Sequence, residues 1–378
     1  MSTDSAPPPI TIPVIPCPKP FTDHIAGNAG DIDLPLRIWP AIIEHGEAEE
    51  AKGKRPWLLW IHGGAFMYGK HYVPNAWVIP AFRSLSYHVV SVSYRFVPQV
   101  THDDIASDIE TAFKWCQLNL SSILGEGRVD LDRYITAGDS AGGHLALWCG
   151  NHLYPPPKLV IDIYGLTALD DPFFELRVPN LPLPILGSTE EELNDALNDR
   201  DKKNAVVTSA FTLELGPFTS VEDLKIAWGS NYVPTKKDIV RADLNVYTFR
   251  NGLKMPNIFR RENFATQEEY VKELKRWSAM YHIRDDQPYP PTFILHGTAD
   301  TIVPCDQSKQ LAIKLRDMGV DVEEKYIQDV DHLFEVYLAG PEDPMWEKAI
   351  LPITQFVQKH FEGKGEGEKA KVTIKSGL

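Results

Sequence analysis

The sequence predicts an α/β fold in which a mostly parallel central sheet is flanked by helices and interrupted by one large, mainly helical insertion. Two observations support this. Short apolar runs alternate with amphipathic helical stretches before residue 166 and again after residue 288, and such alternation is typical of parallel sheets. Between these two blocks the alternation stops and helical signals dominate. The chain is therefore expected to be one sheet-based unit with an insertion.

The first block contains four apolar runs of strand length. They lie at residues 57–61, 88–94, 133–137 and 158–164. Between the second and third runs, Ile105, Ile109 and Phe113 recur at helical spacing, which predicts a helix with one buried face. This order of strands and helix is the one expected of parallel strands joined by crossovers.

The second block repeats the pattern. Residues 292–296 and 321–327 are predicted strands, and residues 307–318 a helix that Gly319 ends as a C′ residue. Residues 346–361 form a closing helix despite Pro352. The remainder, residues 363–378, is predicted to be a frayed tail, and residues 1–55 an amino-terminal arm. Residues 56–165 and 289–362 then make up the core.

Residues 166–288 are predicted to be a helical lid over the carboxyl edge of the sheet. Ser188 with Glu191, and Thr266 with Glu269, have the spacing of capping boxes. Tyr270, Leu274, Trp277 and Tyr281 share one helical face. The aromatic side chains of this segment either line an acyl pocket or form the insertion's own core; they are Phe173, Phe174, Phe211, Phe218, Trp228, Tyr232, Phe249, Phe259 and Phe264.

Composition excludes several classes of protein. The chain has 378 residues with 38 basic and 52 acidic side chains, a net charge of −14, so nucleic acid is not an expected partner. No apolar run reaches the roughly 18–20 residues of a membrane span.

The amino terminus lacks the pattern of a secretory signal, which favours the cytoplasm. The four cysteines form neither a CxxC pair nor a zinc pattern, so reduced and mostly buried thiols are expected. The sequence carries no signal for an oligomeric state.

A serine motif follows the third predicted strand. Gly138-Asp139-Ser140-Ala141-Gly142 matches G-x-S-x-G and stands between that strand and a predicted helix at residues 144–149. In a nucleophile elbow the serine sits on a strained strand-to-helix turn, and the flanking glycines allow close backbone approach. The context predicts that Ser140 is a nucleophile.

A glycine turn follows the first predicted strand. His62-Gly63-Gly64 could present backbone N–H groups to an oxyanion, with the Ala141 N–H as a further donor. The alternative is an ordinary glycine turn at a strand end. His62 is expected to support the turn through hydrogen bonds rather than to transfer protons.

A serine nucleophile needs a base, which must be one of twelve histidines. The chain order Ser, acid, His selects His332, which follows the last predicted strand. His296 and His144 are interpreted as core or helix-start residues.

The acid is predicted to be Asp300, which follows the strand at 292–296 and so lies at the same sheet edge as Ser140. Asp306 is a rival that would instead cap the next helix. Asp329 and Asp331 are too close in sequence to His332 to reach it from a neighbouring strand.

The motifs together resemble the hormone-sensitive-lipase-like branch of the α/β-hydrolases. The segments that carry the resemblance are His62–Gly64, Val92–Pro98, Asp108, Gly138–His144, His296–Asp300 and Asp331–His332. The resemblance implies an α/β-hydrolase fold, an acyl-enzyme mechanism, no metal and no cofactor, with Asp139 and His62 as supporting residues. Carboxylesterases, lipases and kynurenine formamidase-like enzymes belong to or lie near this branch. Ala65 departs from the family's third glycine, and Phe96-Val97-Pro98-Gln99 departs from its usual Leu-Ala-Pro-Glu.

The sequence therefore predicts a serine hydrolase that cleaves an ester or thioester with an apolar acyl group. The partner would be a small acyl molecule, free or bound as a thioester. One alternative is a thioesterase or cyclase of secondary metabolism that passes the acyl group to an internal hydroxyl, as α/β-hydrolase relatives in fungal polyketide pathways do. A second alternative is a non-catalytic small-molecule receptor with a hydrolase-like fold.

Overall fold

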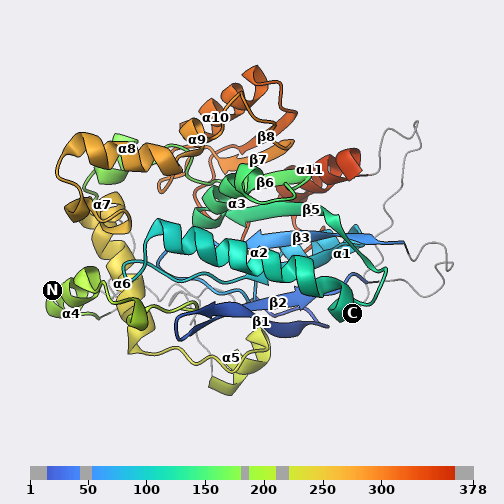
Figure 1. Cartoon of the computed structure of the whole chain (residues 1–378), viewed down its shortest axis with the longest axis horizontal. Helices are drawn as coiled ribbons and strands as arrows, with labels where there is room; N and C mark the ends of the chain where they lie inside the picture. The colour runs from blue at the N-terminus through green and yellow to red at the C-terminus, as the bar shows by residue number, and fades with distance from the viewer. Residues whose placement is uncertain (1–14, 43–52, 180–186, 210–220, 362–378) are drawn as a thin grey trace, which may run out of the picture.

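An eight-stranded sheet forms the centre of the molecule (Figure 1). The computed structural model describes residues 15–42, 53–179, 187–209 and 221–361. The strand order is β1-β2-β4-β3-β5-β6-β7-β8. Six strands run parallel: β3 (Arg55–Ile61), β4 (His88–Val92), β5 (Val129–Asp139), β6 (Leu159–Ile163), β7 (Thr292–Gly297) and β8 (Val322–Ile327). The predicted mostly parallel sheet and its six strands are confirmed.

The sheet also extends into the segment that the sequence analysis treated as an amino-terminal arm. Strands β1 (Thr22–Ala29) and β2 (Ile32–Trp39) form an antiparallel hairpin, and β2 pairs antiparallel with β4. This hairpin was not predicted. Polar residues interrupt its apolar pattern, and one of them, Arg37, is buried.

Helices cover both faces of the sheet, because successive side chains of a strand point to opposite sides. Trp57, Leu59 and Ile61 of β3 pack in the cluster that includes residues of α2 (His102–Leu124) and α3 (Ala141–His152). Leu58 and Trp60 pack in the cluster of α1 (Val78–Ser84) and α11 (Pro344–Phe361). Helix α10 (Cys305–Asp317) packs near α3.

The predicted helix signals in the two core blocks are largely confirmed. Helix α2 contains the Ile105, Ile109 and Phe113 face, which is buried. Helix α10 ends at Asp317, and Gly319 has a φ of 78°, as expected for a helix C′ residue. Helix α11 accommodates Pro352 in its interior. The predicted tail, residues 363–378, lies outside the described residues.

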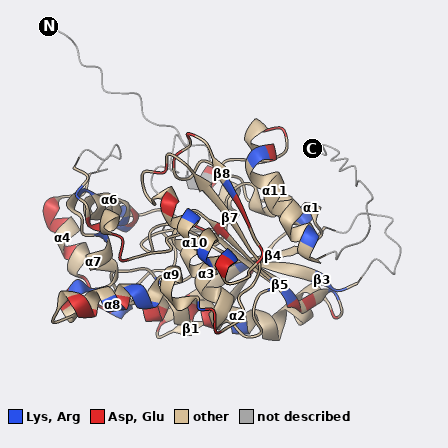
Figure 2. Ribbon diagram, turned by 90° about the horizontal axis from the view of Figure 1, so that it is seen from above, with Lys and Arg blue, Asp and Glu red and all other residues tan. Residues whose placement is uncertain are grey.

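The segment 166–288 is helical wherever the structure describes helices or strands in it, and we refer to it as the insertion. Its helices are α4 (Glu190–Asn198), α5 (Val221–Trp228), α6 (Lys236–Asn251), α7 (Lys254–Ile258), α8 (Gln267–Trp277) and α9 (Ala279–His282). Short 3-10 helices lie at Pro172–Glu175, Lys202–Asn204 and Arg261–Asn263. Helices α4 and α8 lie at the periphery of the molecule and contain many charged residues (Figure 2).

The capping boxes of the insertion lie at or next to their predicted positions. Thr266 and Glu269 form the box that begins α8. The box of α4 uses Thr189 and Glu192, one residue later than predicted. The predicted aromatic stripe ends with α8, so Tyr281 belongs to α9 and is 44% exposed. Within the described residues, no helix has the length and apolar character needed to cross a membrane.

Candidate active site

Ser140 stands at a sharp turn between β5 and α3. Its backbone has φ 53° and ψ −117°, a strained combination for a residue with a side chain. Gly138 and Gly142 make the turn possible, since a Cβ at either position would overlap with the Ile61 carbonyl oxygen of the neighbouring strand β3. The serine is thereby held at the carboxyl edge of the sheet with its side chain facing the cavity described below.

His332 connects Ser140 to Asp300. Its Nε2 lies 3.0 Å from Ser140 Oγ, and its Nδ1 lies 2.6 Å from Asp300 Oδ2. The short Nδ1 contact indicates that this nitrogen donates to the carboxylate, which leaves Nε2 to accept the serine hydroxyl proton. The structure thus brings together Ser140, Asp300 and His332, which were predicted to lie on three separate loops.

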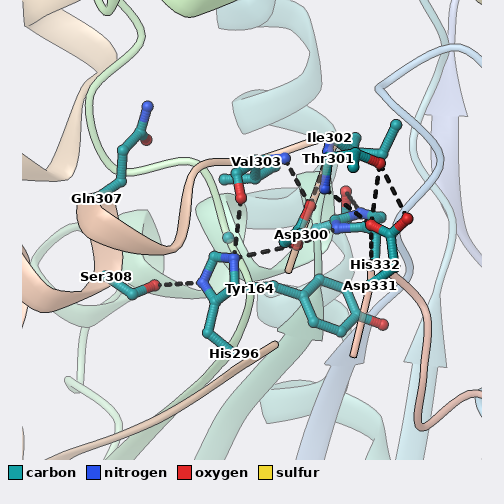
Figure 3. A network of polar contacts seen from close by, with 12 residues as sticks. Tyr164, His296, Asp300, Thr301, Ile302, Val303, Gln307, Ser308, Asp331 and His332 are labelled. Atoms are coloured by element: carbon teal, nitrogen blue, oxygen red, sulfur yellow. Dashed lines mark hydrogen bonds and ion pairs between the residues drawn. The ribbon is translucent and has the colours of Figure 1, made fainter. Parts of the chain in front are cut away.

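Asp300 is held as a carboxylate by several donors (Figure 3). Its Oδ1 accepts from the backbone N–H groups of Ile302 and Val303, both at 2.8 Å. His296 Nε2 donates to Oδ2 at 3.0 Å, and His296 Nδ1 lies 2.8 Å from the Ser308 hydroxyl. Burial alone would raise the pKa of Asp300, but His332 and His296 together lower it below its ordinary value.

The rival acids have other partners. Asp331 accepts from the backbone N–H and hydroxyl of Thr301 and from the His332 N–H. Asp306 pairs with Lys309 on the first turns of α10. Asp329 accepts from Gln328. In this geometry, the contact to His332 Nδ1 is made by Asp300.

The imidazole of His332 is also supported by Tyr164, which is held by the buried carboxyl group of Glu335. The sequence did not reveal this support. The Tyr164 ring packs against the imidazole with 4.4 Å between ring centres. The Tyr164 hydroxyl donates to Glu335 Oε2 at 2.6 Å, and Asn75 Nδ2 donates to Glu335 Oε1 at 2.8 Å. Glu335 follows His332 by three residues, but nothing in its local sequence indicates that its side chain turns into the core.

The glycine turn after β3 differs in one respect from the expectation. The Gly63 N–H donates to Asp139 Oδ1 at 2.9 Å, so this N–H is directed to a carboxylate rather than to a substrate oxygen. Gly64 N–H and Ala141 N–H have no acceptor among the residues that the structure describes. The physical reason is the buried Asp139 side chain, which takes the nearest backbone donor.

Asp139 lies in an unusual electrostatic environment. Burial, followed by the nearby Glu335 carboxyl, raises its pKa to about 7, while the hydrogen bond from Gly63 opposes the shift. Burial also raises the pKa of Glu335. These two neighbouring carboxyl groups are therefore poorly able to carry charge at the same time.

His62 lies beside the same turn in a neutral state. Burial lowers its pKa to about 4. Its Nδ1 donates to the Gly63 carbonyl oxygen at 2.7 Å, and its ring stacks on Tyr94 with 4.6 Å between ring centres. The Tyr94 hydroxyl donates to the His62 carbonyl oxygen. These contacts agree with a supporting role in shaping the turn.

Ser140 and His332 border a cavity of about 380 Å³. Its wall combines the turns after β3, β5 and β8 with residues from α6 and α7. Residues that line it include His62, Gly63, Gly64, Ala65, Tyr68, Lys70, Val73, Asp139, Ser140, Asn245, Phe249, Lys254, Ile302, Asp331, His332, Leu333, Val336 and Tyr337.

Of the aromatic side chains predicted either to line a pocket or to form a core, only Phe249 lines this cavity within the described residues. Phe173, Phe174, Phe259 and Phe264 belong to the large apolar core, and Trp228 and Tyr232 to a smaller cluster. Phe211 and Phe218 lie outside the described residues. The six residues in the two clusters therefore do not line the cavity, and they pack together with residues from outside the insertion rather than in a separate core of the insertion.

The remaining sequence-predicted groups are core residues or thiols. His144 contacts His102 and the Leu166 carbonyl oxygen and is buried. Cys116, Cys149 and Cys305 are buried and Cys17 is half-buried, all as free thiols. Within the described parts of the chain, no three His, Cys, Asp or Glu side chains are grouped as metal ligands would be.

Two family models match separate parts of the chain. The BD-FAE model matches residues 46–153, and the Prolyl oligopeptidase family model matches residues 249–364. Among solved structures, an alpha/beta hydrolase superfamily protein from Enterococcus faecalis aligns with a TM-score of 0.60 at 17% identity, over 89% of this chain and 98% of the other. With the sheet order and the elbow at Ser140, these matches show that the chain has the α/β-hydrolase fold.

A second solved relative is the thermophilic esterase Est2 of Thermogutta terrifontis. Its structure phosphorylated by paraoxon aligns with a TM-score of 0.54 at 15% identity, over 92% of this chain and 96% of the other. At this identity the likeness concerns the fold.

The curated proteins with similar sequences are fungal polyketide synthases. The non-reducing polyketide synthase adrD of Penicillium rubens is 24% identical over 81% of this chain, and mapC' of Penicillium brevicompactum is 25% identical over 83%. This chain spans only 12% and 14% of the length of these two relatives.

Proposed function

We propose that the protein is a serine hydrolase that cleaves an ester or thioester through an acyl-enzyme intermediate. The observation that carries the proposal is the continuous chain of contacts from Ser140 Oγ through His332 to Asp300 at the edge of a cavity. This is the arrangement that makes a hydroxyl nucleophilic near neutral pH.

In the first step, Ser140 Oγ forms a bond to the acyl carbon while its proton moves to His332 Nε2. The carbonyl oxygen becomes an oxyanion, and the Gly64 and Ala141 N–H groups are suited to stabilise it. The bond to the leaving group then breaks, and His332 returns the proton to the departing oxygen or sulfur. Asp300 remains ionised and stabilises the imidazolium ion.

In the second step, His332 takes a proton from water, whose oxygen attacks the acyl carbon. Collapse of this second intermediate breaks the Ser140 ester bond and returns the proton to Ser140 Oγ. The products are a carboxylic acid and the free enzyme. The helices of the insertion that border the cavity would act as a lid and limit the access of bulk water.

We assign the leaving group to the thioester class, with an oxygen ester as the simpler surrogate. Similarity to polyketide synthases over four-fifths of this chain supports this assignment. Apolar side chains of the cavity, such as Val73, Ile302 and Val336, suit the carbon chain of an acyl group.

The test is turnover of N-acetylcysteamine thioesters with acyl chains of four to eight carbons. We expect steady hydrolysis by the wild type, and a loss of about 10⁴-fold in kcat for Asp300→Asn, because the histidine would then lose its anionic partner. Asp329→Asn is the matched control, since Asp329 is exposed and asparagine tolerates its positive φ of 59°. Ligand binding without any turnover would favour the receptor alternative.

Similarity to polyketide synthases also supports the second candidate, release by an internal hydroxyl. Chemically, an alcohol can replace water in the second step. Incubation with a hydroxyacyl thioester and analysis of the products separates the two: free hydroxy acid indicates a hydrolase, and a lactone indicates a cyclase.

A further inference from the structure

The insertion contributes three of the side chains that line the active-site cavity: Asn245 and Phe249 from α6, and Lys254 from α7. Two of the three are polar. This is unexpected for a pocket predicted to hold an apolar acyl group, because such a group offers nothing that an amide or an amine can bind.

Lys254 is 5% exposed, and the described part of the chain provides no hydrogen-bond acceptor or ion pair for its Nζ. Its Nζ lies 3.1 Å from the centre of the Phe249 ring, and the ring face can stabilise the amine when it is protonated. An ammonium group in such a position is costly unless an anion joins it.

Within the described residues, the charge that acts on the pKa of Lys254 belongs to Asp300. Burial lowers the pKa of Lys254 well below its ordinary value, and Asp300 opposes this only in part. The Asp300 oxygens already accept from His332, His296 and two backbone N–H groups. Asp300 is therefore not a dedicated partner for the amine, and an anion brought by a ligand would fill that role.

Asn245 likewise has a buried polar atom without a hydrogen-bond partner in the described part of the chain. It is 3% exposed, and its Oδ1 is buried without a hydrogen-bond donor within the described residues. Buried polar atoms of this kind are rare in native structures, and each one needs an explanation. A donor on a bound molecule, such as a hydroxyl group, would satisfy it.

We propose that Lys254 and Asn245 form a subsite for an acidic oxygen carried by the acyl group, with Lys254 Nζ donating to a carboxylate or enolate oxygen. Asn245 Oδ1 accepts from a hydroxyl on the same acyl group. The inference rests on the proposed hydrolase function and deepens it, since it names an oxygenated acyl group in place of a purely apolar one. The acyl half is assigned because it stays bound through both steps, whereas the thiol leaves after the first.

The test compares N-acetylcysteamine thioesters of matched length. Half-thioesters of dicarboxylic acids from succinate to suberate provide the carboxylate arm, and 5,7-dioxooctanoyl thioester provides the enolate arm. Butanoyl to octanoyl thioesters are the neutral references. For the wild type, we expect a higher kcat/KM for at least one acidic substrate than for the neutral thioester of the same length. A preference for the half-thioesters would identify a carboxylate as the anionic group, and a preference for the dioxooctanoyl thioester would identify an enolate.

Lys254→Met keeps the length of the side chain and its contact with Phe249 but removes the donor. We expect the acidic-to-neutral ratio of kcat/KM to fall about ten- to a hundredfold, the usual effect of a hydrogen bond to a charged group. Lys237→Met removes an exposed lysine of α6 and serves as the control for net charge. Asn245→Leu should lower kcat/KM about fivefold for substrates that add a hydroxyl. Equal losses for acidic and neutral substrates in Lys254→Met would overturn the proposal.

A binding measurement separates this inference from the proposed function. The half-thioester and its neutral counterpart are titrated by calorimetry into Ser140→Ala protein, with and without Lys254→Met. Acid-selective binding that Lys254→Met abolishes supports the subsite even if the wild type shows no turnover, a result that would count against the hydrolase alone. Turnover without any such selectivity would overturn the subsite and leave the hydrolase standing.

Discussion

The imidazole of His332 is held from three directions. Asp300 contacts Nδ1, Ser140 contacts Nε2, and the Tyr164 ring packs against its face. Because Tyr164 is in turn tied to Glu335 on the same loop as His332, the loop and the ring orient each other. Such support from buried hydrogen bonds keeps a catalytic side chain in its productive orientation.

The raised pKa of Asp139, about 7, predicts a pH dependence of stability. An unfolded aspartate has a pKa near 3.9. The folded state therefore holds the proton more tightly, and this group stabilises the fold fully below pH 4 and loses that contribution as the pH rises to about 7. In Asp139→Asn, whose side-chain oxygen still accepts from Gly63, this loss should be absent.

The measurement is the free energy of unfolding in urea at pH 5 and at pH 8. The difference in free energy of unfolding, variant minus wild type, should be about 2 kcal/mol more positive at pH 8 than at pH 5. Asp329→Asn serves as the control, because Asp329 is exposed. An unchanged difference between Asp139→Asn and wild type at the two pH values would refute the prediction.

At the scale of elements, the elbow depends on close contact between the β5–α3 turn and the end of β3. Gly142 lies against the Ile61 carbonyl oxygen, where a Cβ has no room. We expect Gly142→Ala to lower the free energy of unfolding by about 1–3 kcal/mol and kcat/KM by at least about tenfold, because Ser140 moves with the turn.

Gly53→Ala provides the comparison for the elbow variant, because nothing lies within 4 Å of a Cβ at Gly53. It should change the free energy of unfolding by no more than about 0.5 kcal/mol. Similar losses in the two variants would contradict the role of the contact with Ile61.

At the scale of elements, a strand or helix can be predicted when a short stretch of sequence carries its pattern. Strands β3, β4, β6 and β7 consist mostly of apolar residues and are buried along almost their whole length, as expected of strands covered on both faces. The edge strand β8 contains three charged residues and is only partly buried. The hairpin β1–β2 was not predicted, because it is partly exposed and contains polar residues such as Asp33 and Arg37. Its partner strand, β4, lies about 50 residues further along the chain, and no short window of sequence reports that pairing.

The same distinction applies to the site. The motifs around Ser140 and after β3 are local, and the loop positions of Asp300 and His332 follow from chain order. The Gly63 contact with Asp139, the support by Glu335, and the positions of Asn245 and Lys254 all depend on side chains that are distant in sequence. A charge count over the insertion cannot reveal that one of its lysines is buried in the cavity.

For the molecule as a whole, Arg37 ties the first hairpin to the insertion. This buried guanidinium pairs with Asp23 and donates to the carbonyl oxygens of Tyr72, Trp228 and Gly229. Trp228 and Gly229 are about 190 residues away in the chain. A single side chain thus joins the sheet edge, a loop and the end of α5.

Arg37→Met should lower the free energy of unfolding by about 3 kcal/mol, because three carbonyl groups would lose their donor. Urea denaturation followed by tryptophan fluorescence measures the change. Arg316→Met is the control, since Arg316 makes only a partly exposed ion pair with Glu324 and should cost less than about 1 kcal/mol. Equal effects of the two variants would contradict the role of Arg37 as an anchor.

In the proposed reaction one atom reacts, the Ser140 hydroxyl oxygen, which is positioned by the sheet, the elbow and the His332 loop. The most direct test of this claim is labelling with a fluorophosphonate, followed by mass spectrometry of the digested protein. We predict a single adduct on Ser140 that is absent from Ser140→Ala and at least about a thousandfold slower to form in His332→Ala. Undiminished labelling of Ser140→Ala, or an adduct on a different residue of the wild type, would contradict the proposed nucleophile.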